Sequence, residues 1–400
     1  MIKFCHIADC HLGVWNHHPE LAGYPEKALQ KAVDACIEER VNFVIIAGDF
    51  LDTSMPSIET LKAAAVQLSR LKNNDIPVYV VAGSHDYSPS GKTMLSVFSA
   101  SGLMQNVFKP DWHENKLRLA PTIDKSGTLL IGLPGRTASL EKEYYDNLDK
   151  EHLKEILEKN NGLKIFVMHS AISEFKPDFL KNMASIPISS IPGGFDYYAN
   201  GHVHVNKIFD IGSGKMAFPG PLFSSSFKEL EDSNGSFLIN AYSVKITCEI
   251  KNLDFFNVKK IKIDASDKSI ESVENEIELQ LKQENFSNTL VLLEIRGILK
   301  SGKPSDLNIS KIKSLAYGAV AFKVNTNRLE TKTMKEIKVI ADKENIEDIV
   351  IKEHATGSIE NEKQIILSMM KVLNTVKKDG ETVSAFEDRL IKDAKKVINL

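Results

Sequence analysis

The sequence lacks the features that mark secreted and membrane-spanning proteins. It has only four cysteines in 400 residues and no Cys-x-x-Cys pair, which argues against a disulfide framework and against a thiolate zinc site. No run approaches the roughly 20 apolar residues of a membrane span, and the first residues show neither the cationic nor the apolar region of a signal peptide. We therefore expect an intracellular, cytoplasmic protein without a membrane partner.

An excess of charge of one sign is also lacking. The chain has 50 Lys and Arg against 53 Asp and Glu, a net charge of −3, so no overall positive field indicates a nucleic-acid partner, although a local patch can still bind one. With 42% hydrophobic and 26% charged residues, the composition excludes disordered, collagen-like and coiled-coil rod proteins. The length predicts two or three domains.

Up to about residue 245, short apolar runs alternate with amphipathic segments, which predicts strands interleaved with helices in an α/β domain, 1–245. The predicted strands are 2–7, 41–47, 76–82, 163–168 and 197–200. The predicted helices are 57–71, with Ser57 as its N-cap, 92–101 and 142–159.

Two further regions follow this domain. Residues 246–329 predict a smaller α/β unit in the order strand, helix, strand, helix, strand, at 258–263, 269–283, 290–299, 307–316 and 320–325. The Lys- and Glu-rich region 330–400 predicts two helices, 359–378 and 382–400. A solvated tail is an equally good interpretation of this last region from its charge alone.

Polar residues capable of binding metals follow all five predicted strands. They are Asp9 and His11, Asp49 and Asp52, His85 and Asp86, His169, and His202 and His204. Because open α/β sheets place ligands at the carboxyl ends of their strands, we expect five loops to converge on one rim. In an extended chain, residues i and i+2 project to the same face, so we expect each Asp-x-His or His-x-His pair to aim at one point.

Carboxylates and imidazoles without thiolates favour divalent ions such as Mn²⁺, Zn²⁺ or Fe²⁺. A single histidine is usually an ordinary hydrogen-bonded residue, and the ordered set of motifs carries the prediction. Six candidate ligands are more than one tetrahedral ion would bind. We therefore predict two ions roughly 3.5–4 Å apart, with one bridging carboxylate. These six are Asp9, His11, Asp49, His169, His202 and His204.

The motifs resemble those of the calcineurin-like metallophosphoesterases, and among them the SbcD or meiotic-recombination-eleven nucleases of DNA double-strand-break repair. The resemblance rests on Ile-Ala-Asp-Cys-His-Leu-Gly at 7–13, Ala-Gly-Asp-Phe-Leu-Asp at 47–52 and, more loosely, Phe-Pro-Gly-Pro at 218–221. It implies an α/β fold with a β-sandwich flanked by helices, followed by a DNA-capping domain at 246–329 and a C-terminal helical segment.

The resemblance also implies roles for individual residues. Asp9, His11, Asp49 and His204 would hold a first Mn²⁺, and Asp49, His169 and His202 a second, with Mg²⁺, Zn²⁺ or Fe²⁺ as other candidate ions. His85 would be the catalytic histidine, with Asp52 as its orienting partner. Ser84 stands where the family usually has Asn. Since a hydroxyl is a shorter and weaker neutral ligand, Ser84 would hold the second metal less tightly or through water.

The implied activity is a manganese-dependent 3′-to-5′ exonuclease on duplex DNA and an endonuclease on single strands, associated with the nucleoid. The implied partners are DNA, a second copy of the chain and an SbcC-type zinc-hook coiled-coil ATPase. The dimer would form through 57–71 and 92–101, with apolar contacts from Leu61, Ala65, Leu68, Met94, Leu95 and Phe98. The ATPase would dock on an apolar stripe made of Ile365, Ile366, Met369, Met370, Leu373 and Val376.

Lys92, Arg136 and Lys207 are candidates for DNA phosphate contacts. Two other functions remain open. The metal motifs alone do not choose the substrate, so a phosphodiesterase of nucleotides or other small molecules is one alternative, although the regions after residue 245 favour the nuclease. The other is a catalytically weakened scaffold that tethers DNA ends, which only Ser84 favours. The apolar residues assigned to the dimer and to ATPase docking could instead pack within their own domain.

Overall fold

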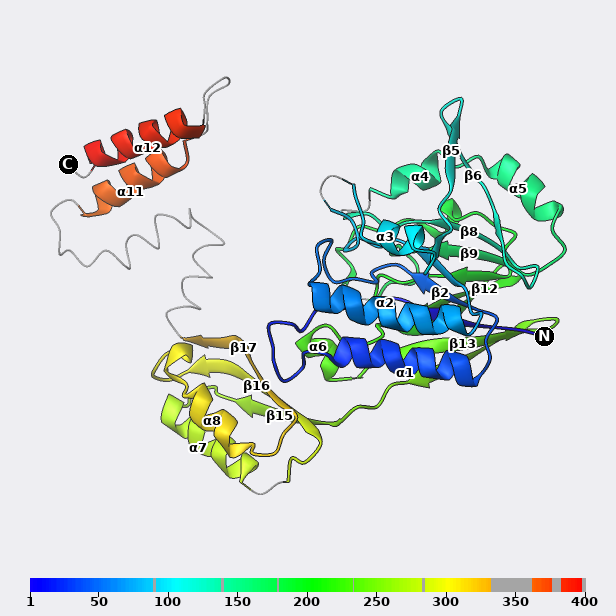
Figure 1. The fold of residues 1–400 in the computed structure, drawn as a ribbon. Coiled ribbons are helices and arrows are strands. Elements are labelled where there is room, and N and C mark those ends of the chain that lie inside the picture. The colour runs from blue at the N-terminus through cyan, green and yellow to red at the C-terminus, as the bar shows by residue number, and fades with distance from the viewer. Residues whose placement is uncertain are drawn as a thin grey trace. The chain divides into compact units, whose positions relative to one another are not determined.

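The computed structural model describes residues 1–88, 91–137, 140–177, 180–232, 234–282, 285–331, 362–375 and 383–397. The chain forms two compact units (Figure 1). The first consists of Met1–Lys260, Asn285–Leu292 and Ala316–Lys323, and the second of Ile261–Glu284, Leu293–Leu315 and Val324–Leu400. No helix within the described residues combines the length and apolar character needed to cross a membrane.

Two six-stranded sheets build the first unit. The strands of one sheet, in spatial order, are β14 (Ile246–Asn252), β13 (Ser236–Tyr242), β1 (Ile2–Ile7), β2 (Phe43–Ala47), β3 (Val78–Val81) and β4 (Gln105–Asn106). Those of the other are β11 (Asn206–Ile211), β12 (Gly214–Pro219), β10 (Tyr197–Ala199), β9 (Lys164–Met168), β8 (Leu129–Leu133) and β7 (Thr122–Ile123). Strands β1, β2, β3 and β4 are parallel, as are β8, β9, β10 and β12.

The side chains along the central strands of the first sheet alternate between two buried faces of that sheet. On β1, Phe4 belongs to a cluster shared by both sheets, whereas Cys5 and Ile7 belong to a cluster on the opposite face. Helices α1 (Tyr24–Glu38) and α2 (Ile58–Asn73) cover that opposite face (Figure 1). Helices α4 (Lys142–Asp146) and α5 (Lys150–Glu158) contribute side chains to the cluster on the second sheet. The predicted β-sandwich flanked by helices is confirmed.

Local capping explains where the predicted helices are right and where they are wrong. The Ser57 side chain accepts a hydrogen bond from the Thr60 N–H and begins α2, as predicted. The predicted helix 142–159 is wrong because it is two helices: Asp149 accepts from the His152 N–H at 3.2 Å and begins α5 as a new helix. The predicted helix 92–101 shortens to α3 (Leu95–Ala100).

The sequence analysis did not predict several elements of this unit. They include the 15-residue helix α1 and three interior strands of the sheets, β8, β12 and β13. The others are the edge strands β4, β7, β11 and β14, together with β5 (Pro110–His113), β6 (Lys116–Leu119), the 3-10 turn η3 (Ile188–Ser190) and α6 (Phe227–Leu230).

The apolar residues expected to join two copies of the chain pack mostly within one copy. Leu68, Leu95 and Phe98 are only 1%, 3% and 5% exposed in the cluster beneath α2, so their assignment to a dimer contact is wrong. Leu61, Ala65 and Met94 are partly buried against the same cluster. The exposed apolar side chains on α2 and α3 are Ile58, Val66 and Val97.

The small α/β arrangement predicted after residue 246 is confirmed in its order of elements. It consists of β15 (Asn257–Asp264), α7 (Ile270–Leu281), β16 (Thr289–Leu299), α8 (Ile309–Leu315) and β17 (Ala321–Thr331), with a 3-10 turn η4 (Pro304–Asp306) before α8. Helix α7 buries Val273, Ile277 and Leu281. Helices α11 (Glu362–Leu373) and α12 (Val383–Val397) pack on each other. Residues 376–382 between them, which include Val376, lie outside the described residues.

Candidate metal centre

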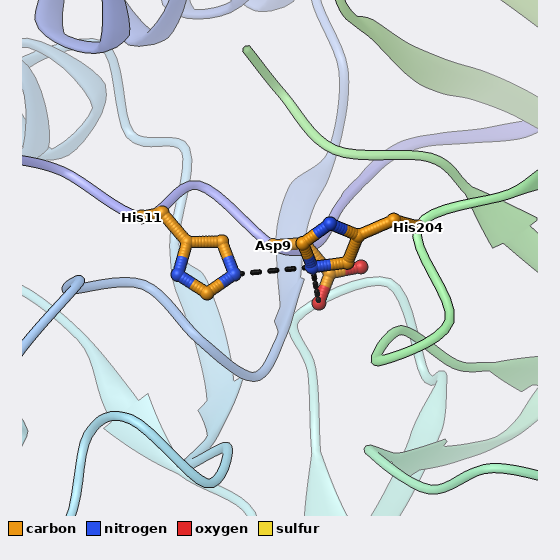
Figure 2. A group of neighbouring side chains, drawn as sticks. All are labelled: Asp9, His11 and His204. Carbon is orange, nitrogen blue, oxygen red and sulfur yellow. Dashed lines mark hydrogen bonds and ion pairs between the residues drawn. The ribbon is translucent and has the colours of Figure 1, made fainter. Parts of the chain in front are cut away.

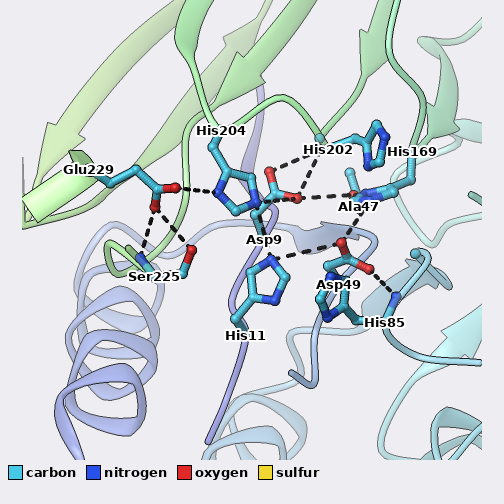
Figure 3. A network of polar contacts seen from close by, with 12 residues as sticks. Asp9, His11, Ala47, Asp49, His85, His169, His202, His204, Ser225 and Glu229 are labelled. Atoms are coloured by element: carbon cyan, nitrogen blue, oxygen red, sulfur yellow. Dashed lines mark hydrogen bonds and ion pairs between the residues drawn. The ribbon is translucent and has the colours of Figure 1, made fainter. Parts of the chain in front are cut away.

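Five loops at the carboxyl ends of β1, β2, β3, β9 and β10 meet at one place (Figure 3). Main-chain hydrogen bonds join the first two loops, from the Asp9 N–H to the Gly48 oxygen at 3.2 Å and from the His11 N–H to the Asp49 oxygen at 3.0 Å. The buried Asn200 side chain joins two others by bonding both the N–H and the C=O of Ser170, at 3.0 Å each.

The side chains at this rim form three groups, in each of which the ligand atoms lie within 4.8 Å of one another. The groups are Asp9 with His11 and His204, Asp49 with His169 and His202, and His11 with Asp52 and His85. In the first group, the Nε2 atoms of His11 and His204 are 3.1 Å apart (Figure 2). In the second, His169 Nε2 lies 3.0 Å from Asp49 Oδ2. The same Asp49 oxygen is 3.8 Å from His11 Nε2, so Asp49 lies between the two groups.

The local backbone differs from the extended geometry that the sequence analysis assumed. Five rim residues have positive φ, namely Asp9 (50°), His11 (41°), Asp49 (48°), His202 (81°) and His204 (49°). The expectation that His202 and His204 aim at one point is wrong, because they belong to different groups. Left-handed backbone costs roughly 1–2 kcal/mol for a residue with a side chain, and tertiary contacts hold it here. The His202 N–H, for example, donates to both Asp9 carboxylate oxygens, at 2.9 and 3.1 Å.

The two central carboxylates are almost fully buried, Asp9 at 1% and Asp49 at 2% exposure. Burial opposes the charged form of Asp49, but the charge and hydrogen bond of His169, together with His11, hold its pKa well below the usual range. Burial likewise lowers the pKa of His169, but Asp49 and Asp9 outweigh it and raise the value to about 10. The imidazolium charge of His169 thus balances the buried Asp49 carboxylate.

His202 and His204 behave differently from each other. Burial and the neighbouring His169 charge lower the pKa of His202 to about 3, which leaves this ring neutral and able to donate a lone pair. For His204, Asp9 and Glu229 outweigh the effect of burial and raise the pKa to about 9. Glu229 itself has a pKa lowered to about 2, because its hydrogen bond with His204 outweighs burial.

Several features of the rim fit a pair of divalent ions. His11 Nδ1 lies 3.3 Å from Asp52 Oδ1, which leaves His11 Nε2 to face His204 in the first group. The facing Nε2 atoms of His11 and His204 can share only one proton when both rings are neutral, whereas one cation can accept both lone pairs. A Cβ atom on Gly83 would lie 2.2 Å from Asp49 Oδ1, so only glycine lets this carboxylate sit there. The donor set, oxygen and imidazole without thiolate, suits Mn²⁺ and related ions.

His85 lies beside these groups and is held by main-chain contacts. Its N–H donates to Asp49 Oδ1 at 2.8 Å, and its ring Nδ1 donates to the Asp52 main-chain oxygen at 2.8 Å. Because a carbonyl only accepts hydrogen bonds, Nδ1 carries a proton. The side chain is 48% exposed. The Asp52 carboxylate is closer to His11 (3.3 Å) than to His85 (4.0 Å), so the main chain of Asp52 orients His85. Ser84 is half-buried in the same loop.

Two carboxylates support the rim in ways that sequence reasoning did not identify. Asp86 is fully buried and accepts from the N–H groups of Phe50, Leu51 and Gly83, which ties the loop after β2 to the loop after β3. Burial and the Asp49 charge raise its pKa to about 6. Glu229 contacts His204 at 3.1 Å from α6. The pattern Ser226-x-x-Glu229 signals only the start of a helix, and nothing local indicates the contact with His204.

The three candidate DNA contacts lie on separate elements. Arg136 follows β8 and is half-buried, with its N–H bonded to Glu141 at 3.2 Å and its guanidinium 5.8 Å from the centre of the Tyr144 ring. Lys92 precedes α3 and Lys207 lies in β11, and both are exposed.

Comparison with known proteins agrees with this geometry. Three relatives are DNA double-strand break repair proteins Mre11. The one from Archaeoglobus fulgidus is 28% identical over 57% of this chain and 52% of that protein. The one from Methanococcus maripaludis is 26% identical over 68% and 74%, and the one from Sulfurisphaera tokodaii is 24% identical over 84% of each. The matched region thus spans about half the length of the first relative and more of the others.

The resemblance inferred from the motifs is confirmed by these matches and by the sequence model of a family described as calcineurin-like phosphoesterase, which matches residues 2–206. This match covers more than half of the chain and includes every residue of the three groups. The chain therefore belongs to the calcineurin-like phosphoesterase family.

Proposed function

We propose that this chain is a metal-dependent nuclease that hydrolyses phosphodiester bonds of DNA during double-strand-break repair. The observation that carries the proposal is the position of Asp49 between two groups of carboxylate and imidazole ligands, with His85 beside them. The three relatives are all DNA double-strand break repair proteins, which favours DNA over other phosphodiesters.

Each subunit would hold two Mn²⁺ ions, with Mg²⁺, Zn²⁺ and Fe²⁺ as alternatives of similar ligand chemistry. Asp9, His11, Asp49 and His204 would hold one, and Asp49, His169 and His202 the other, with Ser84 contributing directly or through water. Such a pair of ions, when bound, polarises the phosphodiester and supplies hydroxide from water near neutral pH.

His85 is the proposed catalytic residue of the chain itself. Its Nδ1–H is held by the Asp52 main-chain oxygen, and since the ring is half-exposed, its Nε2 is available to a substrate. A cationic His85 would protonate the departing sugar oxygen, a contribution typically worth about 10²–10⁴-fold. Asp52 keeps the ring in this orientation and also contacts His11.

The finer substrate assignment belongs to the same proposal: 3′-to-5′ exonuclease activity on duplex DNA and endonuclease activity on single strands. Lys92, Arg136 and Lys207 would contact phosphates, which positions DNA without reading its sequence. A small-molecule phosphodiesterase and a weakened end-tethering scaffold are the competing functions.

The proposed partners are a second copy of the chain and an SbcC-type zinc-hook ATPase, at an intracellular, nucleoid-associated location. For the dimer, Ile58, Val66 and Val97 are the exposed apolar residues of α2 and α3. For the ATPase, the described part of the stripe lies on α11 and ends at Leu373, which is 61% exposed. We also propose the division into a nuclease domain at 1–245, a capping domain at 246–329 and a docking segment at 330–400.

Cleavage of a labelled blunt duplex and of a single-stranded circle with Mn²⁺ tests the function. Wild type should cut both, and His85→Gln should cut neither at a comparable rate. Hydrolysis of model nucleotides without cleavage of DNA would favour the small-molecule enzyme. A wild type that is inert even with its ATPase, while Ser84→Asn is active, would favour the tether.

A further inference from the structure

Glu229 has two separate jobs, one for each carboxylate oxygen. It is the third residue of α6, whose N-cap is Ser226. The Ser226 hydroxyl oxygen accepts from the Glu229 N–H at 3.3 Å. Glu229 Oε2 in turn accepts from the N–H and the hydroxyl of Ser225, at 2.8 and 3.1 Å. This is the reciprocal arrangement of a capping box, displaced by one residue, and it closes the start of the helix.

The other oxygen, Oε1, faces the metal-binding rim. It accepts a hydrogen bond from His204 Nδ1 at 3.1 Å (Figure 3). An ionised carboxylate only accepts hydrogen bonds, so the proton must lie on Nδ1 of His204. The opposite atom, Nε2, then lies 3.1 Å from His11 Nε2 and 3.8 Å from Asp9 Oδ1.

We propose that Glu229 is a positioning residue that fixes both the protonated nitrogen and the rotation of His204, so that His204 Nε2 is directed at a metal ion. The inference rests on the metal assignment in the proposed function. It adds a residue outside 2–206, the part of the chain that matches the phosphoesterase family model.

His169 shows why this contact matters for His204. The Nδ1 of His169 donates to the Ala47 main-chain oxygen at 2.8 Å, a partner that no side-chain substitution removes. The partner of His204 is a side chain, which can be changed without rebuilding a strand. Replacing such a partner of a metal-binding histidine typically costs about 10–100-fold in metal affinity.

Glu229→Gln separates positioning from helix capping. Glutamine serves in a capping box as well as glutamate, so a residue that only closes α6 tolerates the change. A positioning residue does not tolerate the change, because the amide N–H of glutamine can donate to His204 Nδ1. That hydrogen bond would favour the tautomer whose proton lies on Nε2, the atom directed at the metal. We expect one of two Mn²⁺ sites to weaken by about 10–100-fold in calorimetric titration while the other is unchanged. Thermal unfolding without metal should match wild type.

The matched control is Asp149→Asn. Asp149 also caps a helix with one oxygen, by accepting from the His152 N–H, and binds a cationic side chain with the other, Arg118 at 2.9 Å. It lies at the start of α5 and in none of the three rim groups. This variant should bind Mn²⁺ at both sites as wild type does.

Two further measurements guard against a folding defect. Ser225→Ala loosens Glu229 Oε2 and keeps the charge, so it should weaken the same site by less than Glu229→Gln. In protein loaded with diamagnetic Zn²⁺, ¹⁵N NMR should show a protected Nδ1 proton of His204, assigned by its absence in His204→Gln. In Glu229→Gln this proton should exchange faster with solvent.

The proposal is overturned if Glu229→Gln binds Mn²⁺ at both sites with wild-type affinity and its His204 Nδ1 proton is unchanged. It is also overturned if both sites weaken equally and the unfolding temperature falls. A wild type that fails to bind two ions contradicts both this inference and the proposed nuclease. If wild type binds two ions but cuts no DNA, the nuclease proposal fails, and the titration of Glu229→Gln still decides the role of Glu229.

Discussion

The two ligand groups that share Asp49 are supported in different ways. His169 in one group is fully buried and held by the main chain of β2 at Ala47. His204 in the other is 21% exposed and held by the Glu229 side chain. The first arrangement can change only if a strand moves, whereas the second depends on one carboxylate. The comparison teaches that two metal sites with similar ligands can differ in how easily each is perturbed.

Asp49→Asn should have the largest effect, because it removes the one charge that both groups share. We expect loss of tight Mn²⁺ binding at both sites and cleavage of DNA at the background of the assay. His204→Gln and His169→Gln are the controls, and each should weaken mainly one site in a calorimetric titration. Two intact sites in Asp49→Asn would show that Asp49 does not bridge the groups.

His85→Gln should reduce the cleavage rate by about 10²–10⁴-fold, the usual contribution of a general acid. Metal binding should be unchanged, because His85 contacts Asp49 through its main-chain N–H and not through its ring. Cleavage rates and a Mn²⁺ titration on the same preparation test both parts. Loss of one metal in this variant would instead make His85 a ligand.

Removal of the metal ions should lower the free energy of unfolding, by an amount that depends on how many of the two groups bind an ion. An ion at about 100 times its Kd raises the free energy of unfolding by about 2.7 kcal/mol per site. Wild type should therefore lose twice as much on chelation as His204→Gln, which keeps only the group around His169. Equal losses, measured by chemical denaturation with and without chelator, would contradict two independent sites.

Ser84→Asn should have the smallest effect. An amide oxygen reaches farther than a hydroxyl, so the ion held by Asp49, His169 and His202 should bind more tightly, by less than about tenfold, since one neutral hydrogen-bond-strength contact is worth roughly 0.5–1.5 kcal/mol. The site around His204 should not change. Tighter binding at the wrong site, or weaker binding at either, would exclude Ser84 as a ligand position.

The sequence predicted which residues meet but not how they are held. Strand ends located Asp9, Asp49 and His169 because the hydrophobic runs before them are unambiguous. The left-handed backbone at Asp9 and His204 was not predictable, since it is imposed by contacts such as that between the His202 N–H and Asp9.

Long-range contacts account for the other differences. Glu229 carries a helix-start pattern, but its contact with His204 spans 25 residues. The assignment of Leu68, Leu95 and Phe98 to a dimer contact was wrong, because an amphipathic helix shows which face is apolar without showing whether that face meets its own sheet. Leu68 meets its own sheet.

The contacts that build the rim join residues far apart in the sequence, and this affects how the protein matures. The His202 N–H reaches Asp9 across 193 residues, and His169 reaches Ala47 across 122. During synthesis, the chain up to the end of β3 therefore emerges with Asp9, His11 and Asp49 but without β9 and β10, whose loops complete the two groups. Contacts this distant form late, after the loops between them have closed. We expect a chain released before β10 to capture metal poorly, so that metal uptake reports that the sandwich has closed.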